Sequence, residues 1–252
     1  MLDDAQKKDL IHSHTPGAIR RRLQLGVQHS YLKDFIYGAI DGAVTTFAVV
    51  AGVVGAELSS KVIIILGLAN LFADGFSMAV SNFLGTRAEE QQRQKARREE
   101  ENHIQEIPEG EREEIRQIFA SKGFSGQELE HVVEVITSDR KQWVDTMIQE
   151  ELGLALSGPS PWKAAGSTFL AFLLVGSLPL VVFIYDIVSG YPVPQPFLWS
   201  SVMTAGAFFI VGALKGRFVG QKWYLSGAET FLVGTAAAAI AYGIGVLLKS
   251  VV

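Results

Sequence analysis

The chain has 252 residues, of which 48% are hydrophobic, and its formal net charge at pH 7 is −4. Charges are almost absent from some stretches of twenty residues and dense in others, which excludes an ordinary soluble domain. The sequence contains no cysteine, so disulfides and thiolate metal ligands are excluded together.

The first 33 residues are polar, and we interpret them as a tail that precedes the membrane part of the chain. They do not resemble a signal peptide, because no charged start is followed at once by an apolar run. Residues 18–35 mix arginines with leucine, valine and tyrosine, which is typical of a helix on a membrane surface. We do not expect the scattered histidines of this tail to bind metal. They are His12, His14 and His29.

Five apolar stretches are long enough to cross a bilayer, whose hydrocarbon core of about 30 Å needs roughly 20 residues of helix. They lie near residues 36–57, 62–85, 164–186, 197–214 and 226–248. The pair Gly38 and Gly42 in the first stretch predicts a close approach to another helix. We therefore expect an all-α, multi-pass membrane protein with five transmembrane helices.

The distribution of positive charge predicts the orientation. Twenty of the 22 Lys and Arg residues precede the first span, lie between spans two and three, or lie between spans four and five. Only Lys61 and Lys249 fall elsewhere. The positive-inside rule therefore places the N-terminus, the long segment after span two and the 215–225 loop in the cytosol.

The segment between spans two and three is expected to form short helices. The first should continue span two as far as residue 105, where Pro108 and Gly110 break it, and a second should cover 111–121. A third should follow Ser125, an expected N-cap with Glu128 at the third helical position, and a fourth should cover 139–152. The domains expected are a tail (1–33), spans one and two (34–85), an inserted cytosolic helical domain (86–162) and spans three to five (163–252).

Two of the spans carry polar groups at mid-membrane. Asp41 lies in the first, and Asn70, Asp74 and Met78 share one face of the second. A carboxylate there costs roughly 2.5–3.5 kcal/mol, so a functional site facing the bundle interior is expected. The alternative is a protonated aspartate that hydrogen-bonds a neighbouring helix. Carboxylate with thioether suits a borderline transition metal better than calcium or magnesium.

Three pairs of possible metal ligands lie on separate helix faces of the cytosolic segment. They are Glu100 with His103, Glu111 with Glu114, and Met147 with Glu151. Such acidic runs are also typical of solvated helix faces, which is the alternative reading. A ferritin-like di-iron bundle does not fit, because helix breakers keep these helices too short. No phosphate-binding loop supports ATP-driven pumping and no Ser/His/Asp grouping stands out, so we do not expect an enzyme.

With these residues in view, the chain resembles the vacuolar iron transporter family over about residues 30–252. The most specific segments are YGAIDGAVTTFAVVAG (37–52), Ser77-Met78 with Arg87-Ala88-Glu89, PEGEREE (108–114) and WVDTMIQEELGL (143–154). The resemblance implies a five-span homodimer whose cytosolic helices bind metal. It also implies exchange of Fe²⁺ or related divalent metals for protons, with no organic cofactor.

The resemblance also implies roles for particular residues. It places Asp41 and Met78 on the metal path through the membrane, with Asp34 near the cytosolic mouth. Asn70 stands where the family has a glutamate, and we expect Asp74 to substitute for that charge. The implied cytosolic ligands are Glu100, Glu111, Glu114, Met147 and Glu151, with His103 at the position of a family glutamate. Ile148 replaces a second family methionine.

We therefore expect an exporter of Fe²⁺, and also of Mn²⁺, from the cytosol in exchange for protons, with Co²⁺ and Zn²⁺ as possible further ions. The expected partners are metal ions, protons, the lipid bilayer and a second copy of the chain, and no nucleic acid. The alternatives are a membrane-anchored metal sensor or store without transport, and a passive channel. The expected location is the inner membrane of a bacterium or the vacuolar membrane of a eukaryote.

Overall fold

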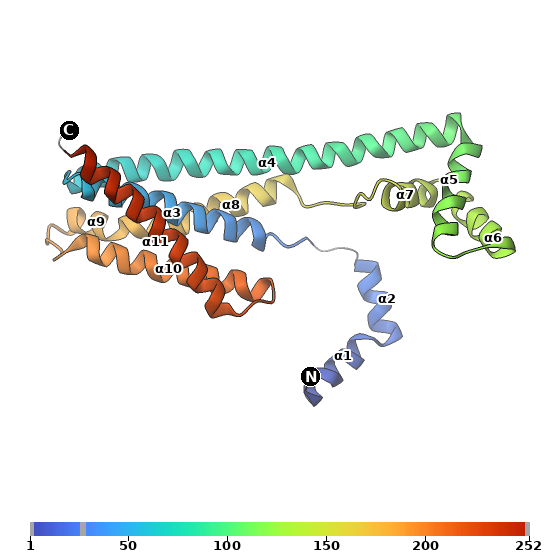
Figure 1. Cartoon of the computed structure of the whole chain (residues 1–252), viewed down its shortest axis with the longest axis horizontal. Helices are drawn as coiled ribbons and strands as arrows, with labels where there is room; N and C mark the ends of the chain where they lie inside the picture. The colour runs from blue at the N-terminus through green and yellow to red at the C-terminus, as the bar shows by residue number, and fades with distance from the viewer. Residues whose placement is uncertain (1–2, 26–28, 250–252) are drawn as a thin grey trace.

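A computed structural model describes residues 3–25 and 29–249, and over these ranges the chain forms helices and no strand. The helices are α1 (Asp4–Ser13), α2 (Pro16–Leu25), α3 (Leu32–Gly55), α4 (Ser60–Glu106), α5 (Pro108–Ser121), α6 (Gly126–Thr137), α7 (Arg140–Glu150), α8 (Pro161–Gly176), α9 (Leu178–Ser189), α10 (Pro196–Phe218) and α11 (Trp223–Leu248). The 47-residue helix α4 runs the length of the molecule and joins a bundle of long helices to a group of short ones (Figure 1). The fold is therefore all-helical, as expected.

Four helices, α3, α4, α10 and α11, are each long and apolar enough to cross a membrane, and the pair α8 and α9 makes a fifth candidate. The third span differs from the single helix expected over 164–186, because α8 and α9 meet at a bend of 52°. Pro179 explains the break, since it lacks an N–H and its ring would clash with the carbonyl one turn earlier. The buried hydroxyl of Ser200 on α10 donates a 2.7 Å hydrogen bond to the Pro179 carbonyl, which stabilises the bend.

Helix α3 lies at the centre of the bundle and packs against α4, α8, α10 and α11. Its small residues make this possible. A Cβ added at Gly42 would lie 2.6 Å from the carbonyl oxygen of Phe172 on α8, and one at Gly38 would collide with the backbone of Thr168. The close helix approach predicted from this glycine pair is confirmed.

The end of α4 (residues 96–106) packs with α5, α6 and α7 to form what we call the distal unit. Its core is a separate cluster of buried apolar residues. They are Ile104, Ile115, Leu129, Val133, Ile136, Trp143, Val144, Met147 and Ile148. The predicted helices are confirmed to within a few residues, although Gly110 lies inside α5 and does not break it. Ser125 is the N-cap residue of α6, but its side chain makes no capping hydrogen bond.

The N-terminal region differs from the expectation of one surface helix over 18–35. Helix α2 ends at Leu25 and α3 begins at Leu32, and a further helix, α1, precedes them. Part of the expected helix, residues 26–28, lies outside the described residues. Both α1 and α2 lie away from the bundle (Figure 1). The polar composition of this region did not predict the break between α2 and α3.

Candidate metal sites

A turn between α4 and α5 brings three possible metal ligands together in the distal unit. Glu100 and His103 share one face at the end of α4, and Glu111 follows on the first turn of α5. Pro108 occupies the first position of α5, where its missing N–H costs no helical hydrogen bond. One ligand atom from each of the three side chains lies within 4.8 Å of the others. This spacing suits a single metal ion.

Burial makes this cluster unusual. Glu100 is 4% exposed and Glu111 is 2% exposed, and an Oε2 atom of each has no hydrogen-bond partner among the described residues. A buried carboxylate without a partner is costly unless a cation or a proton compensates its charge. The two orphan oxygen atoms therefore require either a bound cation or a proton on the carboxyl group.

The carboxylates of the cluster also repel one another. Burial, reinforced by the charges of Glu114 and Glu100, raises the pKa of Glu111 to about 7. Burial and the nearby Glu151 raise the pKa of Glu100, and burial with Glu114 raises the pKa of Glu151. A protonated His103 would oppose each of these shifts. A divalent cation would relieve the same repulsion.

The other predicted ligands of the distal unit surround this cluster less closely. Glu114 is exposed on α5 and Glu151 caps the C-terminus of α7, and the charges of both reach the buried pair. Met147 is fully buried in the apolar core, next to Ile148. The structure thus brings Glu100, His103 and Glu111 together, with the two outer glutamates nearby.

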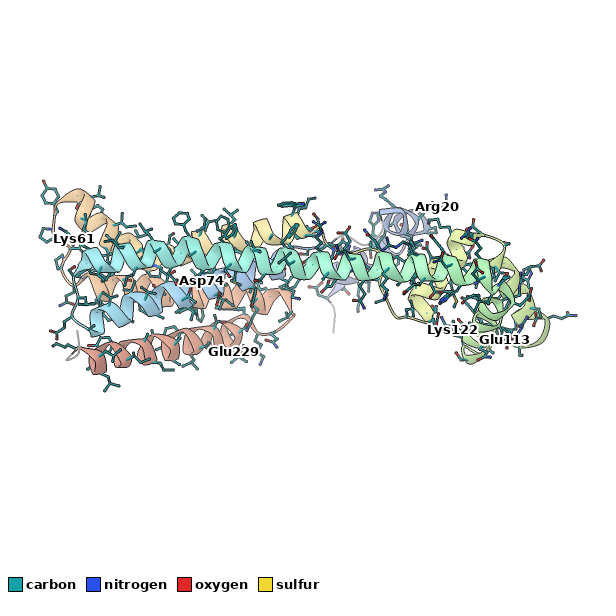
Figure 2. The ribbon with its side chains drawn as sticks, turned by 90° about the horizontal axis from the view of Figure 1, so that it is seen from above. Arg20, Lys61, Asp74, Glu113, Lys122 and Glu229 are labelled. Atoms are coloured by element: carbon teal, nitrogen blue, oxygen red, sulfur yellow. The ribbon has the colours of Figure 1, made fainter. Side chains whose placement is uncertain are left out.

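A cleft of about 510 Å³ brings predicted path residues together in the bundle. Its lining residues are Lys33, Asp34, Tyr37, Asp74, Ser77, Met78, Ser81 and Asn82. Figure 2 shows Asp74 on the part of α4 that runs beside the bundle, far from Glu113 and Lys122 in the distal unit. An adjoining cleft of about 300 Å³ shares Asp34 and Asn82 and extends along α4 to Glu89. The two clefts form one polar groove along α4, from Asp74 to Glu89.

The remaining two path residues do not line this groove. Asp41 is half-buried on α3, close enough to Asp74 for their charges to interact. Asn70 is half-buried on α4, and its Nδ2 atom is buried without a hydrogen-bond partner among the described residues. Asp41 is therefore within electrostatic range of Asp74, which lines the groove, and Asn70 lies apart.

A hydrogen-bond network that the sequence did not predict holds Asp34. The Asn82 amide donates to Asp34 Oδ1 at 2.8 Å and lies 2.7 Å from the Thr168 hydroxyl, which itself lies 3.3 Å from the Asp34 carbonyl oxygen. The network ties α3, α4 and α8 together. Asn82 lies one turn after Met78, close to the helix face that carries Asp74 and Met78. This spacing could have identified Asn82 as a candidate site residue. No sequence pattern identified Thr168, which follows Ser167 near the start of an apolar span.

Comparison with known proteins identifies the family of the chain. A family model described as the VIT family matches residues 32–246. The chain is 36% identical to the vacuolar iron transporter of Toxoplasma gondii, over 88% of this chain and 76% of that protein. It is 30% identical to the vacuolar iron transporter of Plasmodium berghei (98% and 93%) and 31% identical to vacuolar iron transporter 1 of Arabidopsis thaliana (95% and 92%). The chain belongs to the VIT family, and it is a multi-pass membrane protein.

Proposed function

We propose that this protein transports a divalent transition metal, Fe²⁺ and also Mn²⁺, out of the cytosol in exchange for protons. The names of its relatives, which are iron transporters, support the transport of iron. The observation that carries the proposal is the pair of buried, unpartnered carboxylate oxygens on Glu100 and Glu111 beside His103.

The donor chemistry of this cluster fits the proposed cargo. Carboxylate oxygens suit Mn²⁺ and an imidazole nitrogen suits Fe²⁺ and Zn²⁺, so the mixed set favours first-row transition metals over calcium. Glu114 and Glu151 add negative charge at the entrance, which concentrates cations near the cluster. In this proposal the distal unit captures the ion, and the ion is the substrate.

The groove along α4 supplies the membrane part of a route for the ion. It passes from Glu89 to Asp34 and Asn82, and then to Asp74 and Met78. The positive-inside rule places the distal unit and the outer end of this groove in the cytosol. Export from the cytosol follows from a capture site on that side.

A second copy of the chain would complete the route. The groove opens beside Phe72, Phe76 and Val80, apolar residues of α4 that are exposed in the single chain. With lipid on that side, Asp74 would lie next to hydrocarbon, which is costly for a carboxylate. A homodimer that pairs the α4 helices of two copies would cover both the apolar residues and the groove.

Two carboxylates on neighbouring helices of the bundle, Asp41 on α3 and Asp74 on α4, support the proposed proton exchange. Asp41 and Asp74 lie close enough for their charges to interact. Two negative charges in a low-dielectric site repel strongly, so a proton or a metal ion must balance one of them. Entry of a divalent ion would displace protons from this pair, and protons from the far side would in turn release the ion.

Metal flux into proteoliposomes tests the proposal. The purified protein is reconstituted, and uptake of Fe²⁺ and Mn²⁺ is followed with a trapped fluorescent indicator, with and without a pH gradient. We expect uptake to rise when the lumen is acidic and to be abolished in Asp41→Ala. The matched control is Glu229→Gln on α11, which removes a carboxylate that pairs with Lys215 away from the groove.

The same assay separates the alternatives. Metal binding without flux would indicate a sensor or store and contradict transport. Flux that ignores the pH gradient would indicate a passive channel and contradict proton exchange. Unchanged flux in Asp41→Ala would remove Asp41 from the path.

A further inference from the structure

A polar cavity lies where α4 leaves the bundle. It adjoins the membrane groove, with which it shares Pro159, and lies apart from the cluster of Glu100, His103 and Glu111. It has a volume of about 830 Å³ and is lined by residues of α4 and of the linker (151–160) that returns from α7 to α8. Figure 1 shows the course of this linker beside α4. One face of α4 lines it, through residues spaced alternately by four and three positions, which is the spacing of a single helix face. These residues are Phe83, Arg87, Glu90, Gln94 and Arg97, and Gln91 and Arg93 of α4 lie at the edges of this face.

Two arginines of this cavity have no acidic partner among the described residues. Arg97 pairs with Asp145, which also lies 3.4 Å from Lys141. Within the described part of the chain, neither Arg87 nor Arg93 forms an ion pair, although both line the cavity. Glu90 is the one acid among the lining residues. The cavity therefore carries an excess of positive charge.

Aromatic residues indicate that this cavity lies at the level of the membrane surface. Trp162, at the start of α8, is 76% exposed, and its ring lies 4.6 Å from that of Phe83. The Arg87 guanidinium lies 5.8 Å from the Phe83 ring centre, one helical turn beyond the last exposed apolar residues of the α4 span. Exposed tryptophan is typical of the headgroup level of a bilayer. Arg87 therefore lies at that level.

Arg93 extends the positive charge outward from the membrane. It lies six residues after Arg87 on α4, or roughly 9 Å along the helix axis at about 1.5 Å per residue. Its guanidinium packs against Gly158 of the linker, so closely that a Cβ at that position would collide with it. Each headgroup layer of a bilayer is roughly 5–7 Å thick. The two arginines thus bracket the layer that holds lipid phosphates.

We infer that this cavity binds the headgroup of an anionic phospholipid, with its phosphate between Arg87 and Arg93. Guanidinium groups recognise phosphate through paired, charge-assisted hydrogen bonds, and the side-chain amides of Gln91 and Gln94 offer further donors to a polar headgroup. The exposed ring of Trp162 offers an apolar surface for the glycerol backbone and the first carbons of an acyl chain. This apolar surface favours a lipid over free phosphate, and the site is independent of the metal that is transported.

The test uses the full-length protein in a neutral detergent and three probes: dioctanoyl phosphatidylglycerol, dioctanoyl phosphatidylcholine and inorganic phosphate. Thermal unfolding, followed by tryptophan fluorescence, gives the midpoint and the apparent Kd for each probe. Native mass spectrometry counts the lipids that remain bound. We expect phosphatidylglycerol to raise the midpoint saturably, and the other two probes to leave it unchanged at the same concentrations.

The variant Arg87→Gln/Arg93→Gln should weaken the apparent Kd for phosphatidylglycerol by at least roughly tenfold, because two charge-assisted contacts are lost. The charge-matched control Lys95→Gln/Arg98→Gln removes two cations from the same stretch of α4 outside the cavity and should bind as the wild type does. If the double variant does not fold, Arg87→Gln alone, which leaves the Arg93–Gly158 contact intact, should weaken binding severalfold.

Three outcomes would overturn the inference. They are an equal shift with phosphatidylcholine, an equal shift with inorganic phosphate, and wild-type affinity in whichever arginine variant folds. The second would assign the cavity to a free anion, and the third would place lipid binding elsewhere on the protein.

Discussion

Nδ1 of His103 lies 3.4 Å from Oε1 of Glu111, although the histidine side chain is 55% exposed and the glutamate side chain is only 2% exposed. The pair therefore connects solvent to a buried carboxylate. A hydrated ion that reaches the imidazole can pass to the Glu111 carboxylate without a large movement of the backbone, because α4 and α5 already hold the two side chains together. This pair is the proposed entrance of the capture site.

Replacing Glu111 should weaken metal binding by the full-length protein. Glu111→Gln keeps the size of the side chain but removes the charge, so we expect the affinity for Mn²⁺ to fall by at least roughly tenfold. Isothermal titration calorimetry in detergent measures this change. The control is Glu109→Gln, an exposed residue of α5 outside the cluster, which should bind Mn²⁺ as the wild type does. Equal affinity in both variants would contradict the site.

The stability of the metal-free protein should fall as pH rises through the range in which Glu111 ionises. Burial and the carboxylates of Glu114 and Glu100 raise the pKa of folded Glu111 to about 7, against 4.5 for an ordinary glutamate. Between these values the folded state holds more protons than the unfolded state, so raising the pH favours unfolding. With a chelator present, we expect a lower thermal midpoint at about pH 8 than at about pH 5.

The variant Glu111→Gln isolates this contribution, since glutamine has no proton to lose. Its midpoint should exceed that of the wild type at about pH 8, and its decline with pH should be shallower. Glu109→Gln should follow the wild type. Saturating Mn²⁺ should raise the wild-type midpoint most at the alkaline end, where the carboxylate is ionised. Parallel pH profiles for Glu111→Gln and the wild type would show that the residue does not titrate in this range.

Most of the fold could be predicted from the sequence, because length, apolarity and helix breakers act locally. The apolar stretches predicted the spans, and Pro108 predicted the turn between α4 and α5. The bend at Pro179 was missed because the surrounding residues are uniformly apolar, so that hydropathy alone gave one continuous span. The stabilising contact comes from Ser200, which is distant in the sequence.

The candidate sites could be predicted in part. Spacing predicted that Glu100 and His103 share a face of one helix. Only the tertiary fold determines that Glu111 lies beside them and that Met147 lies in the apolar core. Burial distinguishes these glutamates from the solvated acids around them. Spacing on single helices cannot supply that distinction, because it depends on which helices pack together.

Loss of the Asn82 amide should impair entry to the membrane groove. Asn82 donates to Asp34 and contacts Thr168, so Asn82→Ala frees the Asp34 side chain and leaves a gap between α4 and α8. We expect the apparent KM for Fe²⁺ uptake to rise severalfold with a smaller change in maximal rate, because the residue positions an entrance carboxylate. Asn82→Gln, which keeps the amide, should restore part of the loss. An unchanged KM in Asn82→Ala would separate this network from transport.

Enlarging a glycine at the α3–α8 contact should destabilise the bundle. A Cβ at Gly42 would lie 2.6 Å from the Phe172 carbonyl oxygen, and one at Gly176 would lie 2.8 Å from the Gly42 carbonyl oxygen, so the backbones must separate. We expect Gly42→Ala to cost about 1–3 kcal/mol, seen as a lower thermal midpoint in detergent. The control is Gly85→Ala on α4, where a Cβ has open space, so helix propensity should stabilise it slightly. Equal midpoints for the two variants would show that α3 and α8 tolerate a wider spacing.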